Sequence, residues 1–383
     1  MKPLDARTSP PDARPTWVQV DLDALAANVN ALKSHARAER LMAVVKADGY
    51  GHGLIPSAEA ALRGGADWLA VALVEEGEAL RAGGIDAPVL VLAEAPVAAA
   101  GRLLAAGLTP AAYTRPFLEA LDAAGRARDE PVAVQVKLDT GMRRVGVPPT
   151  DWEDALRFVA NAPGLRLQGL WSHFAVADEP HHPFIAHQAR EFRRGLEVAQ
   201  RAGLRPELVH LCNSAGTLHL PDEHFDMVRP GLAVYGLEPA PGLAGAVPLR
   251  PALSWFSRLS MVKDVAAGES VSYGLRWTAE APTRIGTIPA GYADGVRRGL
   301  SNVGRVLAGG RAVPIAGTVC MDQFLVDLGQ AGAAAGDEVC LIGSQGDAVI
   351  SADDWAAWLG TIKYEIVCGI SARVPRVYRG GGA

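Results

Sequence analysis

The sequence predicts an α/β protein in which an N-terminal (β/α)8 TIM barrel is followed by a mostly β C-terminal domain. Apolar segments alternate with helical segments over residues 16–250, and after residue 250 most segments resemble strands. A chain of 383 residues also exceeds what one compact core usually organises, so domains are expected at 16–250 and 251–383. Residues 1–15 are polar and proline-rich and are expected to form a disordered extension.

Eight apolar segments are the predicted barrel strands. They lack polar alternation, as expected for parallel strands that are buried on both faces. They are Leu41–Lys46, Trp68–Leu73, Pro88–Leu92, Thr109–Tyr113, Val132–Leu138, Leu167–Trp171, Leu208–Leu211 and Phe225–Arg229. The alternative is an open doubly wound sheet, and the count of eight strands separated by helices favours the barrel.

Helical segments separate these strands. Asp21 can cap a helix whose apolar residues between positions 22 and 32 fall at helical spacing. Pro116 fits the first turn of another helix. Glycines follow three helical segments, where left-handed C-cap residues occur; they are Gly64, Gly83 and Gly107.

The C-terminal domain is predicted to contain seven strands and one helix. The strands are Arg258–Val265, Ser270–Tyr273, Thr283–Pro289, Val303–Ala308, Ala312–Ala316, Phe324–Leu328 and Glu338–Ile342. Gly309-Gly310 predicts a two-residue hairpin turn between two of them. Ser351 and Asp354 fit a capping box at the start of a helix over Ser351–Leu359.

Composition excludes several classes of protein. The chain has 37 basic and 42 acidic residues, a net charge of −5, and no basic block, so nucleic-acid binding is not expected. It has neither an apolar run of about 18 residues, which a membrane span needs, nor a signal-peptide pattern. The four cysteines have no C-x-x-C spacing, which argues against a zinc site or a disulfide framework. We expect a soluble cytoplasmic protein with buried, reduced thiols.

Polar and ionisable residues gather at the predicted C-terminal ends of the barrel strands, where barrel enzymes carry their reactive groups. They are Lys46, Lys137, Asp139, His173, Asn213-Ser214 and Arg229. Lys46 ends an apolar segment, and desolvation there would lower the pKa of its amine. A free amine can form a Schiff base with a carbonyl compound. The alternative is a strand-end lysine whose amine reaches solvent.

Two loops at the same end could bind a ligand through their backbone. Asp48–Gly53 follows Lys46 and contains three glycines in five residues, which permits close approach and unusual dihedral angles. Ser214, together with the Gly231 loop, could bind a phosphate group through hydroxyl and backbone N–H groups. Ser214 could equally be an ordinary helix N-cap.

The chain resembles the alanine racemase family over nearly its whole length. The matching stretches of the barrel are Ala43–Gly53, Lys137–Met142, Ser172–Ala175, Asn213-Ser214 and Arg229–Gly231. Those of the C-terminal domain are Gly291–Gly295, Cys320–Gln323 and Arg373–Arg376. The resemblance implies a pyridoxal phosphate (PLP) enzyme that interconverts L- and D-alanine as a head-to-tail homodimer with shared active sites.

The resemblance implies that two bases act on opposite faces of the substrate. Lys46 would bind PLP covalently and act as one base, and Tyr292 of the partner subunit would be the other. His173 and Arg229 would assist this tyrosine, whose unperturbed pKa is about 10. Arg229 would also face the pyridine nitrogen of PLP. Because a guanidinium cannot accept a proton, that nitrogen would stay unprotonated, which discourages transamination.

Further roles follow from the same resemblance. The residues that match phosphate-binding positions are Tyr50, Ser214, Gly231 and Leu232, and those that match substrate-binding positions are Arg144, Met321 and Asp322. Lys137 matches a lysine that is carbamylated in some members. Ala372 stands where some members have a tyrosine that gates the pocket. The missing hydroxyl and the extra space suggest a wider substrate range, for example serine.

Several alternatives stay open. The chain could be a serine or broad-specificity amino-acid racemase, which Ala372 favours. A non-catalytic PLP-binding barrel protein would generally lack the C-terminal domain. A decarboxylase of the same architecture would have an acidic residue in place of Arg229. A metal hydrolase would need a His/Asp cluster, and His181-His182 instead lies in a polar loop, so no metal is expected. The sequence does not distinguish an enzyme that supplies D-alanine for cell-wall peptidoglycan from one that serves alanine catabolism.

Overall fold

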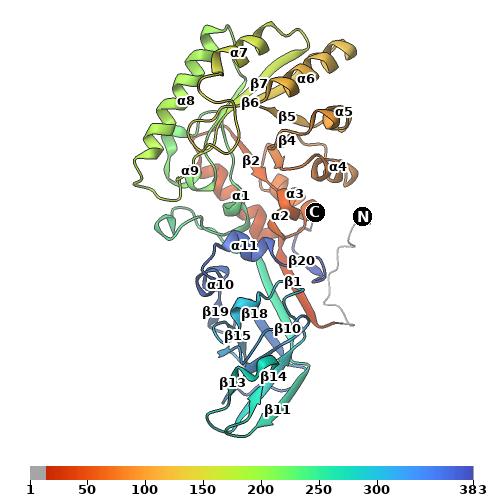
Figure 1. The fold of residues 1–383 in the computed structure, drawn as a ribbon, viewed down its shortest axis with the longest axis vertical. Coiled ribbons are helices and arrows are strands. Elements are labelled where there is room, and N and C mark those ends of the chain that lie inside the picture. Colours follow the sequence, from red (N-terminus) through yellow and green to blue (C-terminus); the bar gives the residue numbers. More distant parts are fainter. Residues whose placement is uncertain (1–13, 383) are drawn as a thin grey trace. The chain divides into compact units, whose positions relative to one another are not determined.

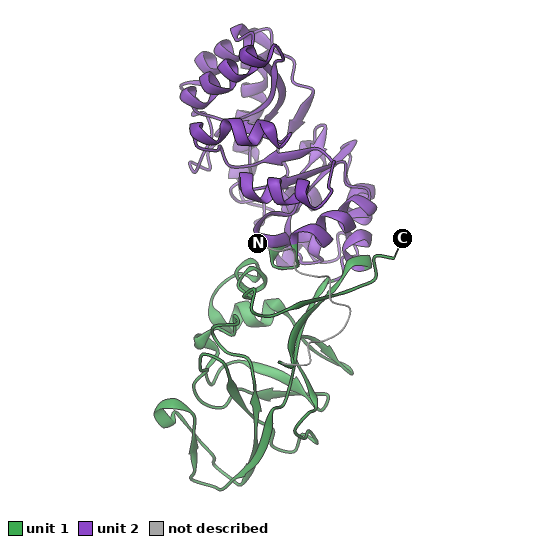
Figure 2. Cartoon of the chain, turned by 90° about the vertical axis from the view of Figure 1, so that its right-hand side faces the viewer, with its two compact units in different colours: residues 1–23, 50–53, 251–383 green, residues 24–49, 54–250 purple. Residues whose placement is uncertain are grey.

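The computed structural model describes residues 14–382, which form two compact units (Figure 2). The barrel unit consists of Ala24–Gly49 and Leu54–Arg250, and the β unit consists of the residues up to Asp23, Tyr50–Gly53 and the residues from Pro251 onward. The expected domain limits of 16–250 and 251–383 differ from this division, because the first strand and a short loop belong to the β unit. Of the expected extension, residues 1–15, only Arg14 and Pro15 lie within the described part.

The barrel unit contains an eight-stranded parallel sheet of order β8-β7-β6-β5-β4-β3-β2-β9. The strands are β2 (Arg40–Val44), β3 (Trp68–Val71), β4 (Val89–Val91), β5 (Thr109–Ala112), β6 (Val132–Lys137), β7 (Leu165–Trp171), β8 (Leu208–His210) and β9 (Met227–Val228). Backbone hydrogen bonds from Asp226 N to Val209 O (3.0 Å) and from Arg229 N to Cys212 O (2.9 Å) connect the two ends of the sheet. The predicted barrel and its eight strands are therefore confirmed.

Helices surround these strands (Figure 1). They are α1 (Leu22–His35), α3 (Leu54–Arg63), α4 (Val74–Ala82), α5 (Ala100–Ala105), α6 (Arg115–Arg128), α7 (Trp152–Asn161), α8 (Phe184–Arg201) and α9 (Ser214–His219). Each of the longer ones buries one apolar face; α6, for example, buries Phe117, Leu118 and Leu121. Pro116 lies in the first turn of α6, as predicted.

The predicted left-handed C-cap glycines are only partly correct. Gly107 has φ +61° and is left-handed. Gly64 and Gly83 are not, and the residues after them, Gly65 (φ +97°) and Gly84 (φ +81°), are left-handed instead. Each pair is a Gly-Gly doublet, so the sequence alone does not indicate which glycine reverses the chain.

The main sheet of the β unit has the order β16-β15-β18-β10-β1-β20, and β19 pairs with β18. Its strands are β1 (Thr16–Asp21), β10 (Leu253–Arg258), β15 (Arg305–Ala308), β16 (Arg311–Pro314), β18 (Glu338–Gln345), β19 (Ala348–Ile350) and β20 (Arg376–Arg379). Strand β1 pairs antiparallel with β10 and parallel with β20. These long-range pairings assign Thr16–Asp21 to the β unit.

Two smaller sheets complete the β unit. One contains β11 (Met261–Val265), β14 (Thr283–Ile288) and β17 (Phe324–Asp327), and the other contains β12 (Ser270–Val271) and β13 (Trp277–Thr278). Helices α10 (Ala352–Leu359) and α11 (Lys363–Cys368) follow β19. The predicted strand Arg258–Val265 is wrong as one element, because β10 ends at Arg258 and the chain then enters a different sheet at Met261.

Two local predictions for the β unit are confirmed. Gly309 and Gly310 have φ of +57° and +74° and connect the antiparallel strands β15 and β16. Ser351 and Asp354 form the capping box of α10, with the Asp354 N–H donating to Ser351 Oγ at 3.1 Å. No described helix is long and apolar enough to cross a membrane.

Candidate active site

The mouth of the barrel is built around Arg229, which directly follows β9 and is 3% exposed. Its Nη1 donates to His210 Nδ1 at 2.7 Å. Its Nη2 donates to His173 Nδ1 at 3.0 Å and to the Ser172 carbonyl at 2.9 Å. Burial lowers the pKa of Arg229 to about 10, so it remains charged at neutral pH. Residues directly after β7 and at the end of β8 therefore converge on the guanidinium that follows β9.

The hydrogen bonds of Arg229 fix the tautomers of two histidines. Because a guanidinium only donates, Nδ1 of His173 and of His210 must accept, and each ring proton lies on Nε2. His210 Nε2 is then the donor to Gln135 Oε1 at 2.9 Å. Burial and the charge of Arg229 lower the pKa of both histidines well below the usual value. Both rings are neutral at pH 7.

Lys137, the last residue of β6, is a second buried basic side chain. Burial, followed by the charges of Arg229, Arg144 and Lys46, lowers the pKa of its amine to about 7, against the opposite effect of Asp139. Its Nζ lies 4.6 Å from the centre of the Trp171 ring, and the Arg229 guanidinium carbon lies 4.7 Å from the same centre.

The predicted residues Lys46, Lys137, Arg144 and Arg229 thus form one cationic cluster at the barrel mouth, together with neutral His173. The charges of Lys46 and Arg144 also lower the pKa of His173. Arg144 itself is exposed on the loop after β6. Such a concentration of positive charge favours an anionic ligand.

The chain directly after Lys46 forms a left-handed turn. The φ angles are +53° at Ala47, +53° at Asp48, +60° at Gly49 and +51° at Tyr50. Left-handed backbone costs a non-glycine residue about 1–2 kcal/mol, and three of these four are not glycine. The glycines predicted unusual dihedral angles here, but not that their neighbours share them. Strain of this kind is concentrated at functional sites.

The loop after β8 corrects one interpretation of Ser214. The N-cap of α9 is Asn213, whose side chain accepts from Gly216 N at 3.0 Å, so the N-cap alternative for Ser214 is wrong. Ser214 Oγ instead accepts from the N–H groups of Gly231 (2.9 Å) and Ala233 (3.2 Å). Leu232 lies between them and is 1% exposed. One hydroxyl and two backbone amides therefore meet at a point suited to oxyanion binding.

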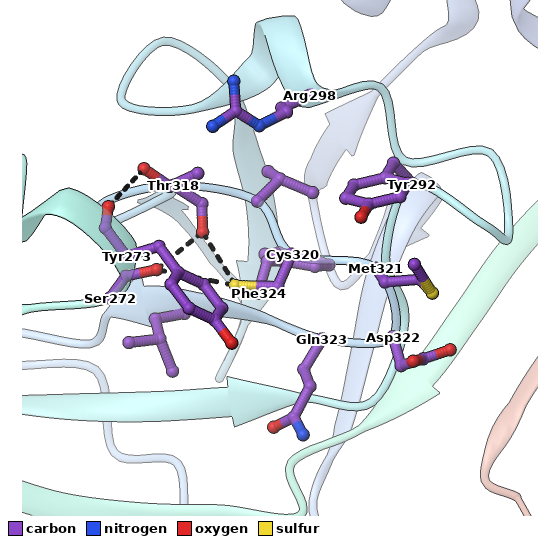
Figure 3. Close-up of a pocket in the computed structure, with 12 residues that line it drawn as sticks. Ser272, Tyr273, Tyr292, Arg298, Thr318, Cys320, Met321, Asp322, Gln323 and Phe324 are labelled. Atoms are coloured by element: carbon purple, nitrogen blue, oxygen red, sulfur yellow. Dashed lines mark hydrogen bonds between the residues drawn. The ribbon is translucent and has the colours of Figure 1, made fainter.

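The β unit has a separate cavity of about 760 Å³ that holds three of the predicted residues, Tyr292, Met321 and Asp322 (Figure 3). The Tyr292 N–H donates to the Cys320 carbonyl at 2.9 Å. Asp322 forms an ion pair with Arg373 at 2.6 Å. The Tyr292 side chain is 42% exposed, so its phenol is accessible.

Tyr273 also lines this cavity and was missed by the sequence analysis, which took it for the end of a strand. Figure 3 shows Tyr273 and Tyr292 on either side of Cys320. Tyr273 is 76% exposed. It lies between left-handed residues, Ser272 at φ +65° and Gly274 at φ +75°. The sequence signal that could have found it is weak: a tyrosine followed by glycine at the end of a short strand.

The remaining predicted residues lie in the β unit. Tyr50 is buried against the Tyr364 ring at 6.2 Å, and burial raises the pKa of its hydroxyl above the usual value. Ala372 is exposed, next to the Arg373 that pairs with Asp322. The cationic cluster and the tyrosine cavity thus belong to different units. Among residues 14–382, no group of three or more His, Cys, Asp or Glu side chains could hold a metal ion.

The fold and these residues define a class of protein: a barrel enzyme with a lysine at its mouth and an appended β domain. Models of the alanine racemase N-terminal and C-terminal domains match residues 20–239 and 252–378. The chain therefore belongs to the alanine racemase family, a family of isomerases.

Individual relatives agree with this assignment. The alanine racemase of Symbiobacterium thermophilum is 47% identical over 368 residues, covering 96% of this chain and 98% of the relative. That of Frankia casuarinae is 47% identical over 364 residues, covering 94% and 95%. The crystal structure of alanine racemase from D-cycloserine-producing Streptomyces lavendulae superposes with a TM-score of 0.92 at 43% identity, covering 96% of this chain and 98% of that one.

Proposed function

We propose that this protein interconverts L- and D-alanine, with PLP as cofactor and two bases on opposite faces of the substrate. The observation that carries this proposal is the buried Arg229 guanidinium, held by two neutral histidines beside Lys46. The protein would work as a cytoplasmic homodimer, and its D-alanine would supply peptidoglycan synthesis.

The residues at the barrel mouth fit PLP. Lys46 would hold its aldehyde carbon covalently, and Arg229 would face its ring nitrogen. Ser214 Oγ and the N–H groups of Gly231 and Ala233, which are hydrogen-bonded to one another, would bind the phosphate together with Leu232 and Tyr50. When bound, PLP supplies an electron sink that acidifies the substrate Cα–H bond.

The protein's own groups would then move one proton. The Lys46 amine would take or return it on one face of Cα, and a phenol oxygen would do so on the other. A phenol needs a nearby positive charge to lose its proton near neutral pH. Arg229 would provide it through His173, whose Nδ1 it binds at 3.0 Å and whose Nε2 carries the proton. Exposed Arg144 would hold the substrate carboxylate, next to Met321 and Asp322 of the partner subunit.

Two tyrosines compete for the role of second base. The family resemblance suggested Tyr292, and the cavity adds Tyr273. We favour Tyr273, because it is 76% exposed against 42% for Tyr292 and is presented by strained backbone. Tyr292 would then line the cavity. In either case the phenol would enter the active site of the other subunit.

The test combines racemisation with isotope exchange in D2O. Lys46→Ala should lose both the visible cofactor absorbance and all turnover. Because the two enantiomers have equal free energy, loss of one base lowers kcat/KM equally in both directions. The variant that lacks the phenol base should therefore racemise about 10²–10⁴-fold more slowly but still exchange the Cα hydrogen of one enantiomer without inverting it.

Tyr273→Phe and Tyr292→Phe are compared to identify that base. A large loss in only one variant assigns the role to that residue. Racemisation at the parent rate in both variants would refute the two-base mechanism.

An amino-acid racemase of broader specificity is the second candidate, because Ala372 is a small residue at a position where some family members have a gating tyrosine. Comparison of kcat/KM for alanine and for serine on the purified protein distinguishes this candidate from an alanine racemase.

A further inference from the structure

A single carboxylate, that of Glu76, connects the ends of two neighbouring barrel strands. Its Oε1 accepts from the Ala47 N–H, after β2, at 2.6 Å. Its Oε2 accepts from the N–H groups of Ala72 (2.8 Å) and Leu73 (3.1 Å), after β3. Hydrogen bonds to an ionised acceptor are roughly twice as strong as neutral ones. Three such bonds make Glu76 a strong local constraint on the backbone of the barrel mouth.

Helix capping accounts for only part of this arrangement. Glu76 is the third residue of α4. The hydrogen bond that it accepts from the N–H of the N-cap residue Leu73 is one of the two bonds of an ordinary capping box. That role requires no donor from another strand. The bond to Ala47 is therefore the informative one, because it joins the helix cap to the chain beside Lys46.

The Ala47 N–H belongs to the peptide group that joins Lys46 to Ala47. Because a peptide group is planar, the direction of this N–H fixes the ψ angle of Lys46. Ala47 has φ +53° and begins the left-handed turn, a conformation that costs an alanine about 1–2 kcal/mol. A bond from Glu76 at this point offsets that cost where the turn starts.

The other end of the turn has a weaker constraint of the same kind. Asp48 Oδ1 accepts from the Leu54 N–H at 2.8 Å, and the Gly49 N–H donates to the Val45 carbonyl at 2.9 Å. A Cβ on Gly49 would lie only 2.6 Å from Ser57 Oγ, so the turn packs tightly against α3. With both ends held, the turn has little freedom, which restricts the orientation of the backbone from which the Lys46 side chain departs.

We propose that Glu76 is a positioning residue for Lys46: by binding the Ala47 N–H it holds the left-handed turn that directs the lysine towards the cofactor. This inference rests on the proposed function, in which Lys46 binds PLP. Glu76 touches neither cofactor nor substrate in this role, and it acts through the backbone alone.

The test uses full-length protein that is stripped of PLP with hydroxylamine and titrated with PLP again. Glu76→Ala should raise the dissociation constant of PLP at least about tenfold, and the isosteric Glu76→Gln should raise it less. Deuterium uptake of peptides covering residues 45–50 should quicken in both. Glu75→Gln is the matched control, because Glu75 lies on the same helix and, among residues 14–382, forms an ion pair with exposed Arg102 at 3.3 Å. It should leave both quantities unchanged.

The outcomes separate this inference from the proposed function. If Glu76→Gln and every folded Glu76 variant bind PLP with the parent dissociation constant, Glu76 is only a helix cap and the inference fails. In that case the Glu76 substitutions would change only the melting temperature and the deuterium exchange of residues 72–76. If borohydride reduction of the parent protein attaches no PLP to Lys46, the proposed function itself fails. An adduct at Lys46 with an unchanged dissociation constant in the variants refutes the positioning role alone.

Discussion

Lys137, His173 and His210 all lie close to the buried guanidinium of Arg229, and the pKa of each is lowered. Arg229 keeps its charge because its pKa falls only to about 10. The site therefore keeps its permanent charge on Arg229, leaves both histidines neutral and leaves the Lys137 amine partly unprotonated near neutral pH. This division of charge suits proton transfer, since a neutral lysine or histidine can accept a proton.

Lys137 gives a prediction of pH-dependent stability. Its pKa is about 7 in the folded protein and 10.5 without the fold. Between these values the unfolded state binds more protons, so stability rises with pH. Below pH 7 the full cost of burying the charge is present. Lys137→Met should therefore be more stable than the parent at pH 6, by up to a few kcal/mol at about 1.4 kcal/mol per pKa unit.

This advantage should shrink as the pH rises from 7 towards 10.5, because both states hold a neutral amine only above the unfolded-state pKa. Urea unfolding without PLP, in buffer free of carbon dioxide, measures it. A difference that is the same at pH 6 and pH 9 would contradict the prediction. A neutral amine is also the form that reacts with carbon dioxide, which supports the proposed carbamylation of Lys137. That proposal predicts a ¹³C carbamate signal that Lys137→Met lacks.

Ala372 gives a prediction of specificity. The residue is exposed beside the Arg373–Asp322 ion pair. Ala372→Tyr would fill space and add a hydroxyl group. The ratio of kcat/KM for serine to that for alanine should fall about tenfold, since small steric differences in a pocket contribute about 1–3 kcal/mol. Steady-state kinetics on both substrates checks this. A ratio equal to that of the parent would remove Ala372 as a specificity determinant.

At the scale of elements, the barrel strands could be predicted because each is a short apolar run between helices, a local property. Strand β1 could not be assigned, because its partners are β10 and β20, more than 200 residues away in the chain. Strand β20 was missed for the same reason. The hairpin at Gly309 and the capping box at Ser351 depend only on neighbouring residues, and both were found.

The same difference between local and long-range features decided which residues of the candidate site could be predicted. Lys46 and Arg229 were found because a barrel places strand ends at one mouth. Tyr273 was missed, because what distinguishes it is its exposure and the left-handed backbone on both sides. Glu76 was missed because a glutamate in the first turn of a helix is ordinary in sequence. Its bond to Ala47 exists only once β2 and β3 lie side by side.

A side chain at Gly53 is predicted to destabilise the β unit. Gly53 has φ +100°, and a Cβ there would overlap with the Tyr378 hydroxyl oxygen. Gly53→Ala should therefore destabilise the β unit by about 3 kcal/mol or more through strain and overlap together. Gly84→Ala is the control, since Gly84 has a similar φ of +81° and open space around it. It should lose only about 1–2 kcal/mol.

A second substitution tests the cause. Tyr378→Phe removes the oxygen atom, so it should partly restore the melting temperature of Gly53→Ala while lowering that of the parent. Equal losses for the two glycine variants, or no restoration by Tyr378→Phe, would show that steric overlap is not the cause.

At the scale of the whole molecule, the functional groups are divided between two units. Lys46, Arg229 and His173 belong to the barrel unit, whereas Tyr273 and Tyr292 belong to the β unit. The proposed two-base reaction would take one base from each set. In the proposed head-to-tail homodimer, the barrel unit of one subunit would meet the β unit of its partner, and the symmetry of the dimer would create two identical sites.

Complementation between two inactive variants tests this arrangement. In a mixed dimer of Lys46→Ala and Tyr273→Phe, a shared site would combine the intact lysine of one chain with the intact tyrosine of the other, and the second site would have neither. Random association makes about half of the dimers mixed, each with one working site, so co-expression should recover about a quarter of the parent activity. The same experiment with Tyr292→Phe covers the other candidate base. If lysine and tyrosine of one chain served the same site, every mixed dimer would be as inactive as the separate variants, and the shared-site homodimer would be wrong.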